Sequence, residues 1–253
     1  MKVRKPTIDE WFLALQLKQV SKRLHLPFFV DIDLTAIHNA YEQKNKKTPY
    51  TAILIKAAAM ILAQKPELNK MLFSTFYGYR FISFSSVTVN VPMLLQLDEK
   101  KLLTAFTVKE AHKKTIAEIQ QEIKKASQRK WKELPINRLI HKKNSFFARI
   151  QLRLILFLIN HFPSIYIKKS GGSISVSSLM NYNDPNIRLK VSAFSNTGLT
   201  LCSCSARQEG QKHILSLGIS VEHMTYHGAE AIEGVQLLAR ILQSKNIDAF
   251  LYT

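Results

Sequence analysis

Two histidines four residues apart, His223 and His227, have the clearest chemical potential in this chain. Apolar residues alternate with small polar ones over residues 214–222, which is the pattern of a half-buried β-strand. This strand runs directly into His223. After Gly228, the apolar spacing of residues 229–243 predicts a helix with one buried face. An imidazole gains and loses a proton near neutral pH, so a histidine held at a strand end can act as a general base.

A single histidine at a strand end also fits a purely structural role. The other histidines lack the setting of a strand end followed by a tight turn, and we interpret them as surface or structural residues. They are His25, His38, His112, His141, His161 and His213.

The order of strand, histidine, three residues, a polar residue, glycine and helix resembles the D-H-R-x-x-D-G signature of dihydrolipoamide acyltransferase catalytic domains. The H-x-x-x-D-G motif of chloramphenicol acetyltransferase and of peptide-synthetase condensation domains has the same layout. Four further segments resemble the acyltransferases in the same order along the chain: residues 22–43, 48–69, 87–123 and 171–182. The chain is therefore identified as a stand-alone, divergent member of the 2-oxoacid dehydrogenase acyltransferase and chloramphenicol acetyltransferase-like superfamily.

This resemblance implies an α/β fold, namely a chloramphenicol-acetyltransferase-like two-layer sandwich in which helices cover a mixed β-sheet. It also implies a homotrimer whose sites lie between subunits, with the histidine from one chain and a serine from its neighbour. His223 takes the position of the family's base. Ser177 takes the position of the serine that hydrogen-bonds the oxyanion, although a register slip of two would put Ser175 or Ser173 there. The alternative for these serines is a solvent-facing role in the strand.

The chain departs from the family signature at several positions. Asp-His-Arg becomes Glu222-His223-Met224, and the aspartate before the glycine becomes His227, which we expect to hydrogen-bond locally or to pair with Glu222. The Gly-Leu-x-x-Pro segment is replaced by KLLTA at residues 101–105. We also expect no lipoyl domain or lipoyl group on this chain, which predicts a free-standing enzyme with a different acceptor.

The predicted function is acyl transfer from a thioester of coenzyme A, or of the phosphopantetheine of an acyl carrier protein, to an unidentified acceptor. His223 is the predicted base, with Ser177 and His227 as the other site residues. No metal is expected, and the sequence assigns no residues to binding coenzyme A. Two alternatives remain: a catalytically inactive trimeric binding or scaffold protein, and a basic protein that binds a membrane or nucleic-acid surface.

Composition places further limits on the chain. Its 253 residues, 46% hydrophobic and 21% charged, predict one domain over residues 1–253. The formal net charge of +18 suits a polyanionic partner, yet no nucleic-acid-binding motif accompanies it, so nucleic acid is not the expected partner. Cys202 and Cys204 are interpreted as small apolar strand residues in a reducing compartment. With no secretory signal evident, we expect a cytoplasmic protein, with the inner membrane face as a peripheral location.

Residues 130–169 form a basic and apolar insertion that the family lacks. Its apolar centre, residues 152–159, is too short and too interrupted by arginine to span a bilayer, which needs about 20 apolar residues. It is interpreted as a helix that is buried or packed in the oligomer, where it lines or caps an acyl channel. The alternative is a basic amphipathic helix that lies on an anionic membrane surface.

Local signals define other elements. Thr7 and Glu10 form the pattern of a capping box that begins a helix, and residues 115–129 have the spacing of an amphipathic helix. Residues 187–194 have the composition of a strand.

Overall fold

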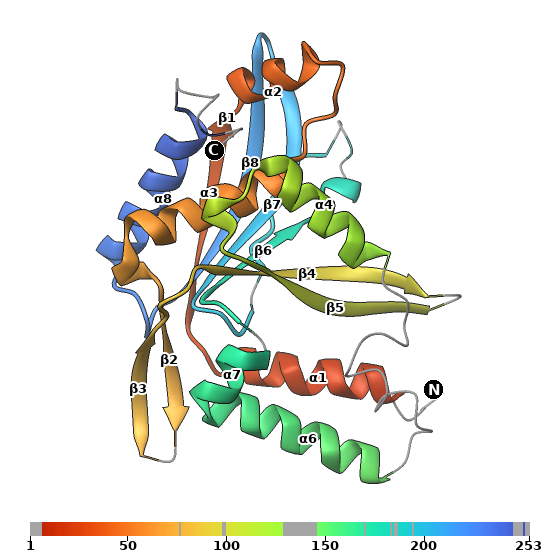
Figure 1. Cartoon of the computed structure of the whole chain (residues 1–253), viewed down its shortest axis with the longest axis vertical. Helices are drawn as coiled ribbons and strands as arrows, with labels where there is room; N and C mark the ends of the chain where they lie inside the picture. Colours follow the sequence, from red (N-terminus) through yellow and green to blue (C-terminus); the bar gives the residue numbers. More distant parts are fainter. Residues whose placement is uncertain are drawn as a thin grey trace.

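A mixed sheet of six strands supports the candidate site, and helices pack against it (Figure 1). The computed structural model describes residues 7–75, 77–97, 100–128, 146–169, 171–182, 184, 187–193, 195–244 and 250. The strand order is β1-β8-β7-β6-β4-β5, with β6 parallel to both of its neighbours and the other pairs antiparallel. The bounds are β1 His25–Asp33, β4 Thr88–Leu97, β5 Lys100–Lys109, β6 Ile174–Ser178, β7 Leu199–Glu209 and β8 Lys212–Glu222. The predicted α/β class and mixed sheet are confirmed.

Four helices enclose the main hydrophobic core against one face of this sheet. They are α2 Thr35–Glu42, α3 Tyr50–Gln64, α4 Ile116–Ser127 and α8 Gly228–Leu242. Helix α3 is apolar on nearly all sides and lies between the sheet and the neighbouring helices α4 and α8, as a helix of this composition must. Short 3₁₀ helices occur in the connections of the described chain, at η1 Pro66–Leu68, η2 Ala111–Lys113 and η4 Met180–Tyr182.

Strand β8 differs from its sequence prediction in being buried on both faces. Leu217 and Ile219 point to the helical core, whereas the small residues between them face a covering segment, residues 187–193. A Cβ atom on Gly218 would lie 1.7 Å from the Val191 carbonyl oxygen. Residues 187–193 form no strand, so the prediction of a strand there is wrong. They cross the sheet face as irregular chain, and the small side chains of β8 let this chain approach closely.

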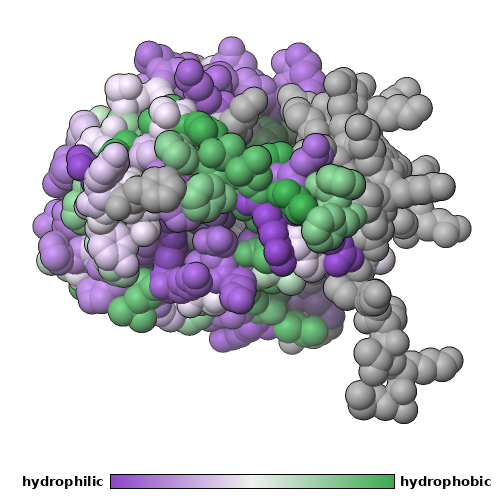
Figure 2. Space-filling model, turned by 90° about the horizontal axis from the view of Figure 1, so that it is seen from below, coloured by the Kyte–Doolittle hydropathy of each residue, from purple (hydrophilic) through white to green (hydrophobic). Residues whose placement is uncertain are grey.

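A second group of helices lies apart from this core (Figure 1). It contains α1 Ile8–Val20, α6 Phe146–His161 and α7 Pro163–Lys169. Leu152 and Leu156 of α6 pack with Phe12 of α1 in a small cluster of their own. A separate hairpin of β2 Lys70–Thr75 and β3 Gly78–Ser83 projects beside these helices. Seen from below, the molecule has a band of apolar surface among hydrophilic side chains (Figure 2).

Several local predictions are confirmed. Thr7 and Glu10 exchange the two hydrogen bonds of a capping box at the start of α1, and Thr115 forms a second box at the start of α4. Cys202 and Cys204 are buried free thiols of β7. Within the described residues, no helix has the length and apolar character needed to cross a membrane. Residues 130–145 of the predicted insertion lie outside the described residues.

The close approach at Gly218 generates a stability prediction. Gly218→Ala should destabilise the protein by about 1–3 kcal/mol, because the covering segment has to move away from the new methyl group. Gly234→Ala is the matched control. Its Cβ would meet only Leu68, at 3.6 Å, and the change should stabilise α8 by up to about 1 kcal/mol. Urea unfolding of both variants measures the two effects, and equal stability of Gly218→Ala and wild type would contradict the close packing.

Candidate active site

His223 directly follows the last residue of β8, where its backbone is fixed and its side chain is exposed. Its backbone N–H donates to the carbonyl oxygen of Leu24 at 2.8 Å. The ring Nδ1 lies 3.4 Å from the carbonyl oxygen of Tyr226. A carbonyl can only accept, so this contact places the proton on Nδ1 and leaves the lone pair on Nε2. The tautomer that a general base requires is therefore the one that the turn favours.

The carboxylate of Glu222, next to His223, is buried and fully paired. One oxygen accepts from the Arg23 guanidinium at 3.0 Å, and the other accepts from the Thr225 hydroxyl at 2.5 Å. Arg23 comes from the connection between α1 and β1, so this ion pair joins two distant parts of the chain. The expected pairing of His227 with Glu222 does not occur: the Glu222 carboxylate is buried with Arg23 and Thr225, whereas the His227 imidazole is exposed.

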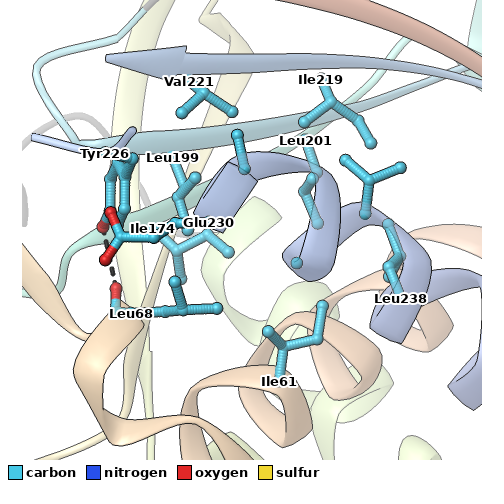
Figure 3. A pocket seen from close by; sticks show the side chains of 13 residues that line it. Ile61, Leu68, Ile174, Leu199, Leu201, Ile219, Val221, Tyr226, Glu230 and Leu238 are labelled. Atoms are coloured by element: carbon cyan, nitrogen blue, oxygen red, sulfur yellow. Dashed lines mark hydrogen bonds between the residues drawn. The ribbon is translucent and has the colours of Figure 1, made fainter. Parts of the chain in front are cut away.

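Two further residues, which the sequence did not single out, fasten the turn to the body of the protein. The Thr225 hydroxyl accepts from the backbone N–H of Leu72 at 3.3 Å. The buried Tyr226 hydroxyl lies 2.8 Å from the carbonyl oxygen of Leu68 (Figure 3) and also 2.8 Å from that of Lys70. Burial raises the pKa of this phenol well above its ordinary value, which keeps the hydroxyl as a hydrogen-bond donor.

His227 occupies the N-cap position of α8. Its backbone N–H donates to the Glu230 carboxylate at 3.0 Å, and Glu230 also pairs with Lys70 at 3.0 Å. The imidazole itself is exposed. This bond uses the backbone, so a local hydrogen bond of the His227 side chain stays a prediction; the helix start lies directly after the histidine turn.

Three alternate serines, Ser173 just before β6 and Ser175 and Ser177 on it, have different surroundings. The Ser173 hydroxyl donates to the Asn69 side chain at 2.6 Å, and the Ser175 hydroxyl accepts from Thr197 at 3.1 Å. The Ser177 oxygen is buried and makes no hydrogen bond of normal geometry within the part of the chain that the structure describes. Its cross-strand neighbour is Cys202, whose thiol is only a weak hydrogen-bonding group. Among the three registers that the sequence left open, Ser177 is the serine whose hydroxyl is not engaged by a strong hydrogen-bond partner in the described chain, and its oxygen is buried within the single subunit.

Ser177 and His223 of one chain do not meet. Ser177 pairs with Cys202, and Cys202 pairs with Gly218 on β8. Glu222 is four residues further along β8, a distance of about 13 Å at 3.3 Å per residue, and His223 follows it. A reacting centre that used both side chains would have to draw them from two different subunits.

The apolar space beneath the turn is too small for a substrate. Figure 3 shows a cavity between the sheet, α3 and α8, with a volume of about 30 Å³. Such a volume suits about one water molecule, and an apolar lining keeps it dry. Its lining consists of core residues such as Ile61, Val221 and Leu238. The described residues also contain no group of three or more possible metal ligands.

Comparison with known proteins agrees with this architecture. Residues 13–134 match the model of the 2-oxoacid dehydrogenases acyltransferase (catalytic domain) family. No curated protein sequence matches the chain significantly. The predicted resemblance to the dihydrolipoamide acyltransferases is confirmed by the family match and by solved structures with the same fold.

Three solved structures illustrate the shared fold. The truncated catalytic core of the 2-oxoacid dehydrogenase complex of Thermoplasma acidophilum has a TM-score of 0.66 at 15% identity, covering 97% of this chain and 100% of that chain. The dihydrolipoamide acetyltransferase of Azotobacter vinelandii has a TM-score of 0.65 at 16% identity, covering 99% of this chain and 94% of that chain. A probable dihydrolipoamide acetyltransferase of Listeria monocytogenes has 0.62 at 17%, covering 97% of each chain.

The buried ion pair beside His223 generates a second prediction. Arg23→Met should lower the free energy of unfolding by about 1–3 kcal/mol, because it leaves the buried Glu222 carboxylate with a single partner. In a double-mutant cycle with Glu222→Gln, the two changes should be clearly non-additive. The exposed pair Lys65–Glu233, at 3.6 Å, is the control, and its coupling should stay below about 1 kcal/mol. Additive effects at Arg23 and Glu222 would show that the pair does not hold the turn.

Proposed function

We propose that this protein is an acyltransferase that moves an acyl group from a thioester of coenzyme A, or of an acyl carrier protein, to a second substrate. The observation that carries the proposal is the histidine turn. His223 is exposed, whereas the residues around it are fixed by buried contacts, namely Glu222 with Arg23 and Tyr226 with the carbonyls of Leu68 and Lys70. A histidine with a purely structural role would not need its backbone fixed by buried contacts while its ring faces solvent.

In the proposed reaction His223 acts as the general base. Its Nε2 accepts the proton of the hydroxyl, thiol or amine of the acceptor, while the acceptor atom forms a bond to the thioester carbonyl carbon. The carbonyl electrons move onto oxygen and give a tetrahedral oxyanion. When the intermediate collapses, the carbon–sulfur bond breaks, and the leaving thiolate takes the proton back from the imidazolium. Charge and atoms balance without a metal.

We assign the oxyanion contact to Ser177 of a neighbouring subunit. The Ser177 hydroxyl, whose cross-strand neighbour is the weakly hydrogen-bonding Cys202 thiol, can donate to the negative oxygen as it forms. Because His223 and Ser177 lie far apart in one chain, the proposal requires an oligomer, and a closed trimer is the form that the family resemblance implies.

The Azotobacter vinelandii structure adds support for these assignments. That work concerns the role of a serine, a histidine and an asparagine four residues after the histidine in the catalytic mechanism of the enzyme. In this chain Ser177 and His223 correspond to the serine and the histidine, and His227 stands where that protein has the asparagine, four residues after the base. We propose that His227, through its backbone bond to Glu230, fixes the start of α8 and thereby the turn. The proposed place of action is the cytoplasm.

An inactive binding or scaffold protein is the second candidate function. The observation that favours it is the exposed imidazole of His227 in place of the family's aspartate, since an exposed side chain fixes the turn less firmly. Thioester turnover separates the two candidates.

Substitution of the base tests the mechanism directly. His223→Ala should lower kcat/KM for thiol release from acyl-coenzyme A by about 10²–10⁴, and Ser177→Ala by about 10²–10³. Met224→Ala is the control, since Met224 is exposed beside the base and takes no part in the proposed reaction. Wild-type turnover in the folded His223→Ala variant would refute the assignment. No turnover by the wild type with any coenzyme A or carrier-protein thioester would favour the scaffold.

Subunit mixing tests whether the site is shared. When His223→Ala and Ser177→Ala subunits are unfolded, mixed equally and refolded together, about a quarter of the interfaces should combine an intact histidine with an intact serine. Activity should therefore return to about a quarter of the wild-type level. A mixture no more active than its two parents would show that the two residues do not form a shared site.

A further inference from the structure

Helix α6 has two apolar faces, and the described structure covers one of them. Ala148, Leu152 and Leu156 are buried against α1. On the opposite side, four large side chains at spacings of four, four and three residues form an exposed stripe, hereafter the α6 stripe: Phe146, Ile150, Leu154 and Phe157. Phe146 is 73% exposed and Leu154 is 54% exposed. A helix with this pattern needs a second apolar environment beyond α1.

The charged residues along α6 and α7 themselves have a single sign. Residues 146–169 contain no aspartate or glutamate, and their charged side chains are arginine and lysine. The guanidinium groups of Arg149 and Arg153 each lie 5.3 Å from the ring centre of Trp11 on α1, which holds them beside the helix. On α7, Ile167 and Lys168 extend the combination of exposed apolar and basic side chains.

We propose that α6 binds the surface of an anionic lipid bilayer and lies in its interfacial plane. The 16 residues of α6 span about 24 Å, and the helix meets no criterion for crossing a membrane, so it would lie along the surface rather than cross it. The α6 stripe enters the boundary between headgroups and acyl chains, while arginine and lysine at its edges pair with lipid phosphates.

The charge of the α6 face favours the lipid surface over another copy of the protein. The charged residues of segment 146–169 are arginine and lysine, so two copies that met through this face would place like charges opposite each other. An anionic bilayer offers the opposite charge and an apolar interior at once. The membrane-binding layer would also lie close to the candidate site, because Arg23 follows the end of α1 by three residues and pairs with Glu222 beside His223.

Vesicle flotation with the full-length protein tests this inference. The wild type should float with phosphatidylcholine vesicles that contain phosphatidylglycerol, and much less with vesicles of phosphatidylcholine alone. The variant Ile150→Gln/Leu154→Gln should lose about tenfold or more in partitioning, since two large apolar side chains no longer enter the bilayer. Binding should also weaken as salt rises, because the Debye length falls from about 10 Å at 0.1 M to about 3 Å at 1 M.

Ile232→Gln is the matched control. Ile232 is exposed to a similar degree on α8, away from α6, so its replacement should leave flotation unchanged. Thermal unfolding of each variant shows whether the fold is kept, which is expected because the substituted side chains are exposed. Failure of the wild type to bind anionic vesicles would overturn the inference, as would equal binding by the Ile150→Gln/Leu154→Gln variant, which would reveal attraction by net charge alone. A lower oligomer mass for that variant, without vesicle binding by the wild type, would assign the α6 stripe to contacts between copies. The assay measures binding and not turnover, so these outcomes leave the proposed acyl transfer standing.

Discussion

The buried carboxylate of Glu222 is the constraint on which the candidate site depends. A buried charge is unfavourable unless it is paired and hydrogen-bonded, and this one has Arg23 on one oxygen and Thr225 on the other. Satisfying it joins the end of β8 to the α1–β1 connection and closes the turn that presents His223. The exposed ring of the candidate base is thus held by a buried carboxylate and hydroxyl and by a partly buried guanidinium.

Of the three alternate serines at β6, Ser177 is the one whose hydroxyl makes no normal hydrogen bond in the described chain. Ser173, just before β6, and Ser175 on β6 are engaged by Asn69 and Thr197, as buried hydroxyls normally are, whereas the buried Ser177 oxygen makes no normal hydrogen bond in the described chain. Because the register places Ser177 far from His223 along the sheet, one subunit holds two incomplete halves. A shared interface is the arrangement that reconciles this geometry with acyl-transfer chemistry.

Helix α6, which lies in the segment interpreted from the sequence as an insertion, contributes more to the surface of the molecule than to its main core. Leu152 and Leu156 join a small cluster with Phe12, separate from the core under the sheet. The sequence left a buried helix and a membrane-surface helix as alternatives for this segment. In the structure α6 combines features of both, with one face packed on α1 and the other exposed between basic side chains. An addition of this kind can give a fold a new location without altering the sheet that supports the site.

By itself the sequence determined what depends on local patterns. The strand that ends at His223, the turn, the helix after Gly228 and the buried helix α3 follow from apolar spacing and punctuation by glycine and proline. Only the tertiary structure decided which distant residues hydrogen-bond to the residues of this turn. Arg23 meets Glu222 across 199 positions, and the Tyr226 hydroxyl reaches carbonyls 156 and 158 positions away, so no local pattern announces either contact. The same holds for residues 187–193, whose composition favours a strand. They cover β8 as irregular chain because the space over Gly218 admits a backbone there, and a sequence pattern does not reveal which distant segment will fill such a space.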